Sequence, residues 1–579
     1  MTALRKTLLT SVALGLGWCV CGPSLRSAPA GTPHDPLPVA ARIDREIDRR
    51  LAEAKVPASP LADDAEFIRR LSLDIRGRIP TAERAAAFLA DTDPNKRQKL
   101  VDEFLADAAY GEHFGTVWYH RMAKPTMDNR QLLSIKFRDW LAERFNCNET
   151  WDAVVRDILT ASGDRDQNPA TVFYLAHAEG NGRREIVPAR VNASASSLFL
   201  GVKLECCECH DHMFDHSLKQ TDFWGMAAFF TATQAENAGK NEDGVPGVKE
   251  AVPSGQFAER ANKAAAKLKA IGKVAPKAAE KAAKAAEKIA AKAAAAKGAA
   301  VIPDTNGKTV PARFLHAEAP KLAGKSEYRP VLANWVTSPK NPYFAKAMVN
   351  KVWANFFGRG IVNPIDDMRS DSPNTHPALL DALAAEFTAS GFDVKHLIRC
   401  ICNSAAYQRT SRPLPQNRDD EELYSHMKLK VMSADVLYDS LTTVLAREPA
   451  AQGRFAAKAK AKAKAGPRTP REEFRNFFHA EADDDSGVVE DYTHGIPQVL
   501  RLMNSQSMSD TKAVVAKLAK ANESPEKAIE ALYLRVLSRR PTAPESERMV
   551  HYVAAGDSAK GYGDALWVLI NSSEFLFNH

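Results

Sequence analysis

The sequence predicts a mainly α-helical, multi-domain protein with little sheet. A chain of 579 residues is too long for one ordinary domain, so two to four domains are expected. Hydrophobic residues make up 45% of the chain, which is typical of a globular protein. Apolar residues recur at three- and four-residue spacing along most of the sequence, whereas strand-like alternation is scarce.

Residues 1–30 have the pattern of an export signal. Arg5 and Lys6 provide a basic start, the apolar stretch LLTSVALGLGWCVCG follows, and Ala28 to Ala30 offer a small-residue cleavage site. The apolar run is shorter than a membrane span, and no later segment is long and apolar enough to be one. We therefore expect an exported protein of the periplasm or cell surface, without a transmembrane span after signal removal. Covalent haem attachment and disulfides are both possible there.

Three segments near the start of the chain predict amphipathic helices. Residues 35–56 and 64–75 place apolar side chains on one helical face, and residues 93–122 continue this pattern. They open a helical domain that we expect to span residues 38–235.

A repeat links the two ends of the chain. Residues 67–93 and 532–557 each combine an apolar-basic helix, a short turn containing arginine, Pro-Thr, and a second helix. Thr542 and Glu545 have capping-box spacing, and Thr81 is suited to an N-cap. The repeat is either a true duplication or a commonly occurring helix-turn-helix arrangement. In both cases it predicts helices with a structural role and no chemical one.

Two low-complexity segments carry the basic charge. The net charge is +7, but an Ala/Lys-rich helical insertion at 256–300 contributes +8. The run KAKAKAK at 458–464, within a basic linker at 456–470, contributes +4, which leaves −5 for the rest. The folded part is therefore mildly acidic, and nucleic acid is not expected as a partner. The insertion is either a solvated spacer or a basic arm that contacts acidic surface polymer.

These segments divide the chain into blocks. After the signal we expect a first domain at 38–235, the insertion at 256–300, a block at 310–450, the linker at 456–470 and a C-terminal helical block at 471–579.

The stretch LECCECHDHMFDH, residues 204–216, is the strongest candidate site. Cys206, Cys209 and His210 satisfy C-x-x-C-H, in which two thiols can add to the vinyl groups of a haem while the imidazole becomes an axial ligand of the iron. A second interpretation is a zinc or other transition-metal site. A third is a disulfide that holds a loop. The candidate ligands of the metal site are Cys206, Cys209, His210, His212, Asp215 and His216.

A weaker candidate follows the aromatic helix predicted in residues 341–357. Asp366, Asp367 and His376 lie near one another in the sequence, and an acid, a base and a cation together could support hydrolysis. A structural network of arginine–carboxylate pairs explains them equally well. His376 before Pro377 also predicts a helix start, and Gly358 and Gly360 predict the end of the preceding helix.

The chain resembles large exported proteins, abundant in planctomycetes, that pair a planctomycete cytochrome-type domain with a second planctomycete-specific domain, both of unknown function. The segments that carry the resemblance span almost all of the mature chain: LSLDIRGRIPTAERAAAFL, LFLGVKLECCECHDHMFDHSLKQTDFWGMAAFF, NPYFAKAMVNKVWANFFGRGIVNPIDDMRSDSPNTHPALLDALA, LIRCICNSAAYQRTS and LINSSEFLFNH.

The resemblance implies that Cys206, Cys209 and His210 are the motif residues, followed by an Asp-His-x-Phe-Asp run that begins at Asp211. Met213 stands where a proline is usual, and Cys207 is an additional thiol. The resulting hypothesis is an exported protein that binds haem c and transfers electrons. The alternative is a non-catalytic protein of the cell envelope that assembles with other exported proteins and whose motif holds zinc or a disulfide.

Overall fold

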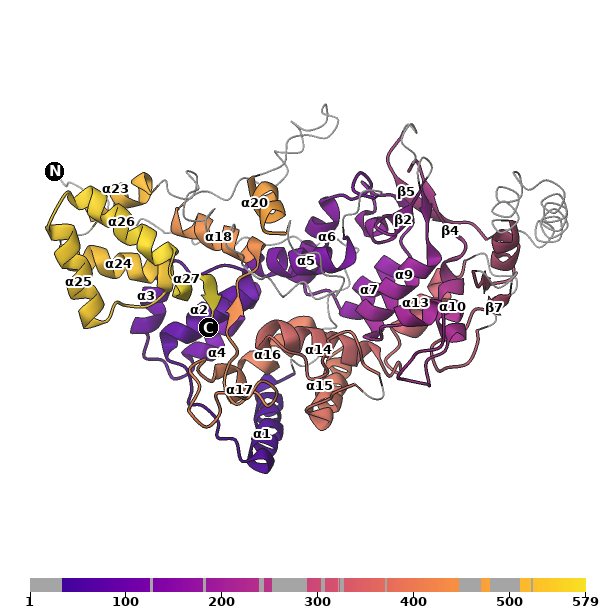
Figure 1. Cartoon of the computed structure of the whole chain (residues 1–579), viewed down its shortest axis with the longest axis horizontal. Helices are drawn as coiled ribbons and strands as arrows, with labels where there is room; N and C mark the ends of the chain where they lie inside the picture. Colours follow the sequence, from indigo (N-terminus) through magenta and orange to yellow (C-terminus); the bar gives the residue numbers. More distant parts are fainter. Residues whose placement is uncertain are drawn as a thin grey trace, which may run out of the picture.

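The computed structural model describes most of the chain between His34 and His579 (Figure 1). The described ranges are 34–124, 129–180, 184–238, 244–252, 289–303, 308–320, 322, 327–369, 372–446, 470–479, 511–521 and 524–579. The predicted export signal, residues 256–288 of the insertion and residues 456–469 of the linker lie outside them. Helices dominate the described residues and the strands are short, so the mainly α-helical prediction is confirmed.

The first part of the chain is a series of helices interrupted by short loops. They are α1 (Pro36–Ala54), α2 (Asp64–Arg76), α3 (Ala82–Ala90), α4 (Lys96–Ala106), α5 (Ala108–Met122), α6 (Lys136–Asn146), α7 (Trp151–Leu159), η1 (Pro169–Thr171), α8 (Val172–Leu175), α9 (Pro188–Ala195), η2 (Ser196–Leu200), η3 (Glu205–Glu208), α10 (Gln220–Ala227) and η4 (Ala228–Phe230). The pattern predicted over residues 93–122 forms two helices, because Asp107 ends α4 and caps α5 by accepting from the backbone N–H of Ala109.

The second part continues with helices of similar length. They are α13 (Arg329–Val336), α14 (Phe344–Phe357), α15 (Pro377–Ala389), α16 (Val394–Cys402), α17 (Ala405–Gln408), α18 (Ala434–Val444), α20 (Pro470–His479), α23 (Lys512–Ala521), α24 (Pro525–Leu537), α25 (Ala543–Ala554), α26 (Ser558–Ile570) and α27 (Ser573–Leu576). As expected, α14 ends at a left-handed Gly358 with φ of 72°, and α15 begins with Pro377.

In the part of the chain that the structure describes, the strands form four small antiparallel sheets. One has the order β1 (Gly163–Asp164), β5 (Gly247–Glu250), β4 (Thr233–Glu236), with Ala235 opposite Val248. The others pair β2 (Ala178–Glu179) with β3 (Glu185–Ile186), β6 (Ala299–Val301) with β7 (Thr309–Pro311), and β8 (Lys430–Val431) with β9 (Phe577–Asn578). The last pair joins the end of the chain to the loop before α18.

The predicted repeat forms two helix-turn-helix units that pack together. α2 and α3 make one unit, α24 and α25 make the other, and α3 contacts α24 (Figure 1). Both expected caps are present: the Thr81 hydroxyl accepts from the Arg84 backbone N–H, and the Thr542 backbone N–H donates to Glu545. The fully buried Arg69 of α2 donates to the carbonyl oxygens of Val536 and Phe575, which ties the two ends of the chain together.

Buried side chains form one large core and a smaller second one. The large core runs from α1 through α16, and the smaller one joins Leu73 and Ile79 to α18 and the C-terminal helices. The α5–α6 contact is close because Gly115 lies directly against the Ala142 backbone. Among the described residues, no helix is long and apolar enough to cross a membrane.

Candidate functional site: the Cys206–His216 loop

The C-x-x-C-H motif lies on a short turn between η2 and α10. Cys206 is within the 3₁₀ turn η3, and Cys209 and His210 follow it. The first turn of α10 holds this loop, because Gln220 donates its side-chain amide to the Cys209 carbonyl at 2.8 Å. The Trp224 indole also donates to the Glu208 carbonyl at 2.9 Å. The helix that follows the motif loop, α10, is therefore packed against the loop and holds its backbone in place.

The three thiols of the loop differ in exposure. Cys206 and Cys209 are free and exposed, whereas Cys207 is completely buried. Burial, reinforced by the neighbouring Cys206, raises the pKa of the Cys207 thiol to about 11, so this thiol stays protonated at neutral pH. The additional thiol, Cys207, is therefore inaccessible to solvent, whereas the two thiols that the motif requires are accessible.

His210 has the hydrogen bond that a metal-ligating imidazole needs. Its Nδ1 lies 2.7 Å from the Asp211 carbonyl oxygen, and the ring is exposed. Because a carbonyl oxygen only accepts, Nδ1 carries the proton in this contact. The neutral ring then keeps its lone pair on Nε2, which is the tautomer that binds a metal through Nε2.

His212 and Asp215 are buried and shape the loop instead. His212 Nδ1 accepts from the backbone N–H groups of Phe214 at 3.2 Å and Asp215 at 3.0 Å, so Nε2 carries the proton of the neutral ring. Asp215 accepts from both the backbone N–H and the hydroxyl of Ser217. His212 would have to give up its contacts to bind a metal as a neutral ring, whereas both Ser217 contacts of Asp215 go to Oδ1.

The alternative metal set is not gathered around one point. The loop contributes Cys206, Cys209, His212, Asp215 and His216 to this set. A preformed metal site needs at least three such side chains with their ligand atoms close together. Within the described ranges, one group of three has its ligand atoms within 4.8 Å of one another, and that group lies outside the motif loop.

Apolar side chains lie exposed beside the thiols. Met213 is 68% exposed and Phe214 is 71% exposed. The Arg369 guanidinium lies 6.0 Å from the centre of the Phe214 ring. Exposed apolar surface of this kind is typical of a site that another group covers. Two accessible thiols, an imidazole with the ligating tautomer and adjacent apolar surface fit covalent haem.

A cavity of about 720 Å³ has one lining residue, Lys203, that is close to the motif in the sequence. Lys203, three residues before Cys206, lines it together with residues of α5, the loop after α14 and the segment that leads into α18. Basic side chains outnumber acidic ones on its wall. The basic and imidazole groups are His113, His120, Arg121, Lys203, Arg359, Lys428 and Lys430; the carboxylates are Asp74, Asp367 and Asp435.

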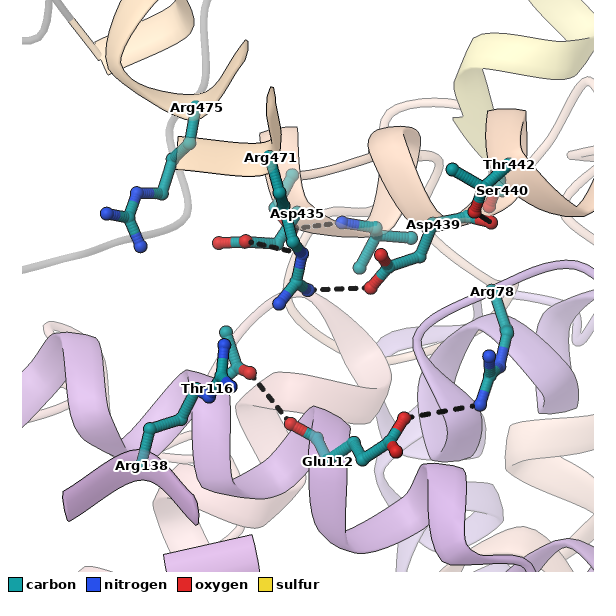
Figure 2. A network of polar contacts seen from close by, with 12 residues as sticks. Arg78, Glu112, Thr116, Arg138, Asp435, Asp439, Ser440, Thr442, Arg471 and Arg475 are labelled. Carbon is teal, nitrogen blue, oxygen red and sulfur yellow. Dashed lines mark hydrogen bonds and ion pairs between the residues drawn. The ribbon is translucent and has the colours of Figure 1, made fainter. Parts of the chain in front are cut away.

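A buried polar network includes two residues that line this cavity, His120 and Asp435. Figure 2 shows the part of the network around Asp435, Asp439 and Arg471. His120 Nε2 lies 3.0 Å from Asp435, and Arg471 contacts both Asp435 at 3.3 Å and Asp439 at 2.6 Å. Burial alone would raise the pKa of Asp435, but Arg471 and His120 hold it well below its usual range. Burial raises the pKa of Asp439 to about 6. Sequence reasoning missed this network, because His120 and Asp435 are 315 residues apart.

The two aspartates of the weaker candidate site have cationic partners. Asp366 pairs with Lys351, which is 1% exposed and also donates to the Ser197 carbonyl. Burial favours the neutral acid, but Lys351 lowers the pKa of Asp366 below its usual value. Asp367 accepts from Arg369 at 2.7 Å and lines the cavity.

His376 belongs to a different environment. It is 2% exposed, contacts the Thr375 hydroxyl at 2.9 Å and packs against the Tyr424 ring. Burial, with the charge of Arg50, lowers its pKa to about 4. Within the described residues, no hydrogen bond or ion pair joins His376 to Asp366 or Asp367. The structure therefore gives these residues separate structural contacts.

Comparison with protein families finds two matches in this chain. Residues 42–235 match PSCyt2, described as a protein of unknown function (DUF1549), and residues 328–553 match PSD1, described as a protein of unknown function (DUF1553). No curated protein and no solved structure matches the chain. The motif loop lies in the first matched region, and the cavity is lined by residues of both.

Proposed function

This chain belongs to the proteins that join a PSCyt2 domain to a PSD1 domain, and on that premise we propose that it is an exported protein that binds haem covalently and transfers electrons. Cys206 and Cys209 would hold the haem covalently, and His210 would bind its iron through Nε2. Bound haem supplies one-electron redox chemistry.

The observation that carries this proposal is the arrangement of the motif side chains. The two thiols that C-x-x-C requires are free and exposed, and the third thiol is buried. The His210–Asp211 contact sets the imidazole tautomer in advance. His212 and Asp215 hold the backbone of the same loop through their own hydrogen bonds.

The residues around the motif favour haem over a single zinc ion as the bound group. Met213 and Phe214 leave apolar surface exposed on the same loop as the thiols, and a haem face could cover such surface, whereas a zinc ion could not. Basic side chains line the cavity, among them Lys203, which lies three residues before Cys206 in the sequence, and a basic side chain suits the negative charge of haem propionates. The competing function is a non-catalytic protein of the cell envelope whose Cys/His motif holds zinc or a disulfide.

Expression in a bacterial periplasm with and without cytochrome c maturation proteins tests the proposal. The expected product with the maturation proteins keeps haem on a denaturing gel, since thioether bonds survive denaturation. The product made without them should lack haem. A protein that contains zinc and no haem under both conditions would overturn the proposal and favour the structural alternative.

Variants within the motif supply matched controls. Cys206→Ser combined with Cys209→Ser should abolish haem retention, because both thioether bonds are removed. Cys207→Ala should retain haem, since that thiol is buried. Retained haem in the double serine variant would assign the attachment to another part of the chain.

A further inference from the structure

A second cluster of metal-binding side chains lies at the junction of α1, α15 and α16. His34 immediately precedes α1, Glu386 is on α15 and His396 is on α16. The ligand atoms of these three residues all lie within 4.8 Å of one another. Nothing in the proposed function uses them, because the motif loop lies between η2 and α10.

We propose that His34, Glu386 and His396 bind a zinc ion. Glu386 Oε1 lies 3.3 Å from His34 Nδ1 and 2.8 Å from His396 Nε2. Ligands held at 2.0–2.1 Å around a tetrahedral zinc lie about 3.4 Å apart, so small side-chain movements open the required space. Two imidazoles and one carboxylate form a known zinc-binding set.

Without a metal, the side chains of the cluster are joined by hydrogen bonds. The Glu386 carboxylate can only accept, so His396 Nε2 carries the proton of their contact. A zinc ion bound at Nε2 would displace that proton, and the neutral ring would then carry its single N–H proton on Nδ1. Nitrogen ligands select zinc and related transition metals over magnesium or calcium, which prefer oxygen.

Burial makes the cluster an ordered site with a solvent-facing side. His396 is 4% exposed, and its backbone N–H is fixed by Asp393, which caps α16. The side chains of Glu386 and His34 are 25% and 46% exposed, so an ion can enter from their side. The Cys400 thiol, one turn after His396 on α16, lies 3.5 Å from His396 Nε2. This sulfur adds a further soft donor atom to the surroundings of the site.

Zinc at this position would connect the start of the described chain to the second matched region. α1 already packs against both α15 and α16, and the ion would join the three elements through their side chains. The expected role is structural, comparable to a crosslink, and binding of zinc to the folded state raises its stability.

Zinc titration of the metal-free full chain tests this site. The Cys206→Ser/Cys209→Ser background is used, so that the motif thiols cannot bind the ion. We expect one zinc per chain in this background and an increase in melting temperature on zinc addition. Glu386→Gln, which preserves side-chain size, should weaken zinc binding at least tenfold, and His396→Ala should do the same.

The control is His551→Ala, which removes an exposed histidine of α25 and should leave zinc affinity unchanged. Circular dichroism checks that each variant is folded, and Glu386→Gln decides the result if His396→Ala unfolds. Failure of the double serine background to bind zinc would overturn the proposal. Unchanged zinc affinity in folded Glu386→Gln would also overturn it. Neither outcome affects the haem experiment, which depends on Cys206 and Cys209.

Discussion

Thiol labelling of the haem-free protein should separate the three cysteines of the motif loop. The structure exposes Cys206 and Cys209 but buries Cys207. We predict that a maleimide modifies the two exposed thiols rapidly in the folded protein and leaves Cys207 unmodified. The buried Cys400 and Cys402 of α16 should behave like Cys207.

The pKa of Cys207 sets the size of the difference. The thiolate is the reactive form, and an ordinary thiol with a pKa near 8.5 is about 24% thiolate at pH 8. Burial raises the pKa of Cys207 to about 11, which leaves about 0.1% thiolate at the same pH. Cys207 should therefore react about 200-fold more slowly than an ordinary thiol from ionisation alone. Its lack of solvent contact slows it further.

Brief labelling at pH 8, acid quenching and tryptic mapping measure these rates. Trypsin cuts after Lys203 and Lys219, so one peptide contains all three thiols, and its fragment ions locate the label. Labelling in guanidinium provides the control, because all three thiols should then react at similar rates. Labelling of Cys207 as fast as Cys206 in the folded protein would refute the structural separation of the thiols.

Three further substitutions test the packing that supports the site. Glu250→Gln should lower the free energy of unfolding by about 3–5 kcal/mol, because it leaves the Arg329 guanidinium, 1% exposed, without its carboxylate; urea denaturation measures this loss. Gly115→Ala should cost about 1–3 kcal/mol in the same assay, since its added carbon would lie 2.7 Å from the Ala142 backbone nitrogen. His376→Phe should flatten the stability profile between pH 6.5 and pH 4. The folded pKa of His376 is about 4, so the unfolded state binds its proton first as the pH falls, and about 3 kcal/mol is lost by pH 4.

Matched controls separate these effects from general damage. Glu236→Gln removes an exposed partner of Lys249 and should change stability by less than about 1 kcal/mol. Gly556→Ala adds a carbon to open space and should be neutral or raise stability by up to about 1 kcal/mol. An equal loss of stability in Glu250→Gln and Glu236→Gln would contradict the packing argument. So would an equal loss in Gly115→Ala and Gly556→Ala. An unchanged acid slope in His376→Phe would contradict the assignment of that slope to His376.

Much of the helical architecture could be predicted because it depends on local signals. Thr542 with Glu545, Gly358, and Pro377 mark helix ends through their own backbone preferences and short-range hydrogen bonds, and each acts as expected. Asp107 was not foreseen as a helix boundary. The apolar pattern continues through it, and only its cap to Ala109 shows the break.

The chemistry of the motif loop could be predicted only in part. C-x-x-C-H fixes which residues are adjacent, but burial of Cys207 depends on packing of the supporting helix. The different tautomers of His210 and His212 depend on individual backbone contacts. The zinc cluster could not be found from sequence, because Glu386 and His396 meet His34 only through the packing of α1 on α15 and α16.

Tandem mass spectrometry of the peptide that spans residues 204–219, from protein isolated from the cells that naturally make it, tests the central claim most directly. Covalent attachment predicts one haem per peptide, bonded to Cys206 and Cys209, with Cys207 unmodified. A peptide without haem, whose Cys206 and Cys209 are unmodified or bound to zinc before digestion, would contradict it.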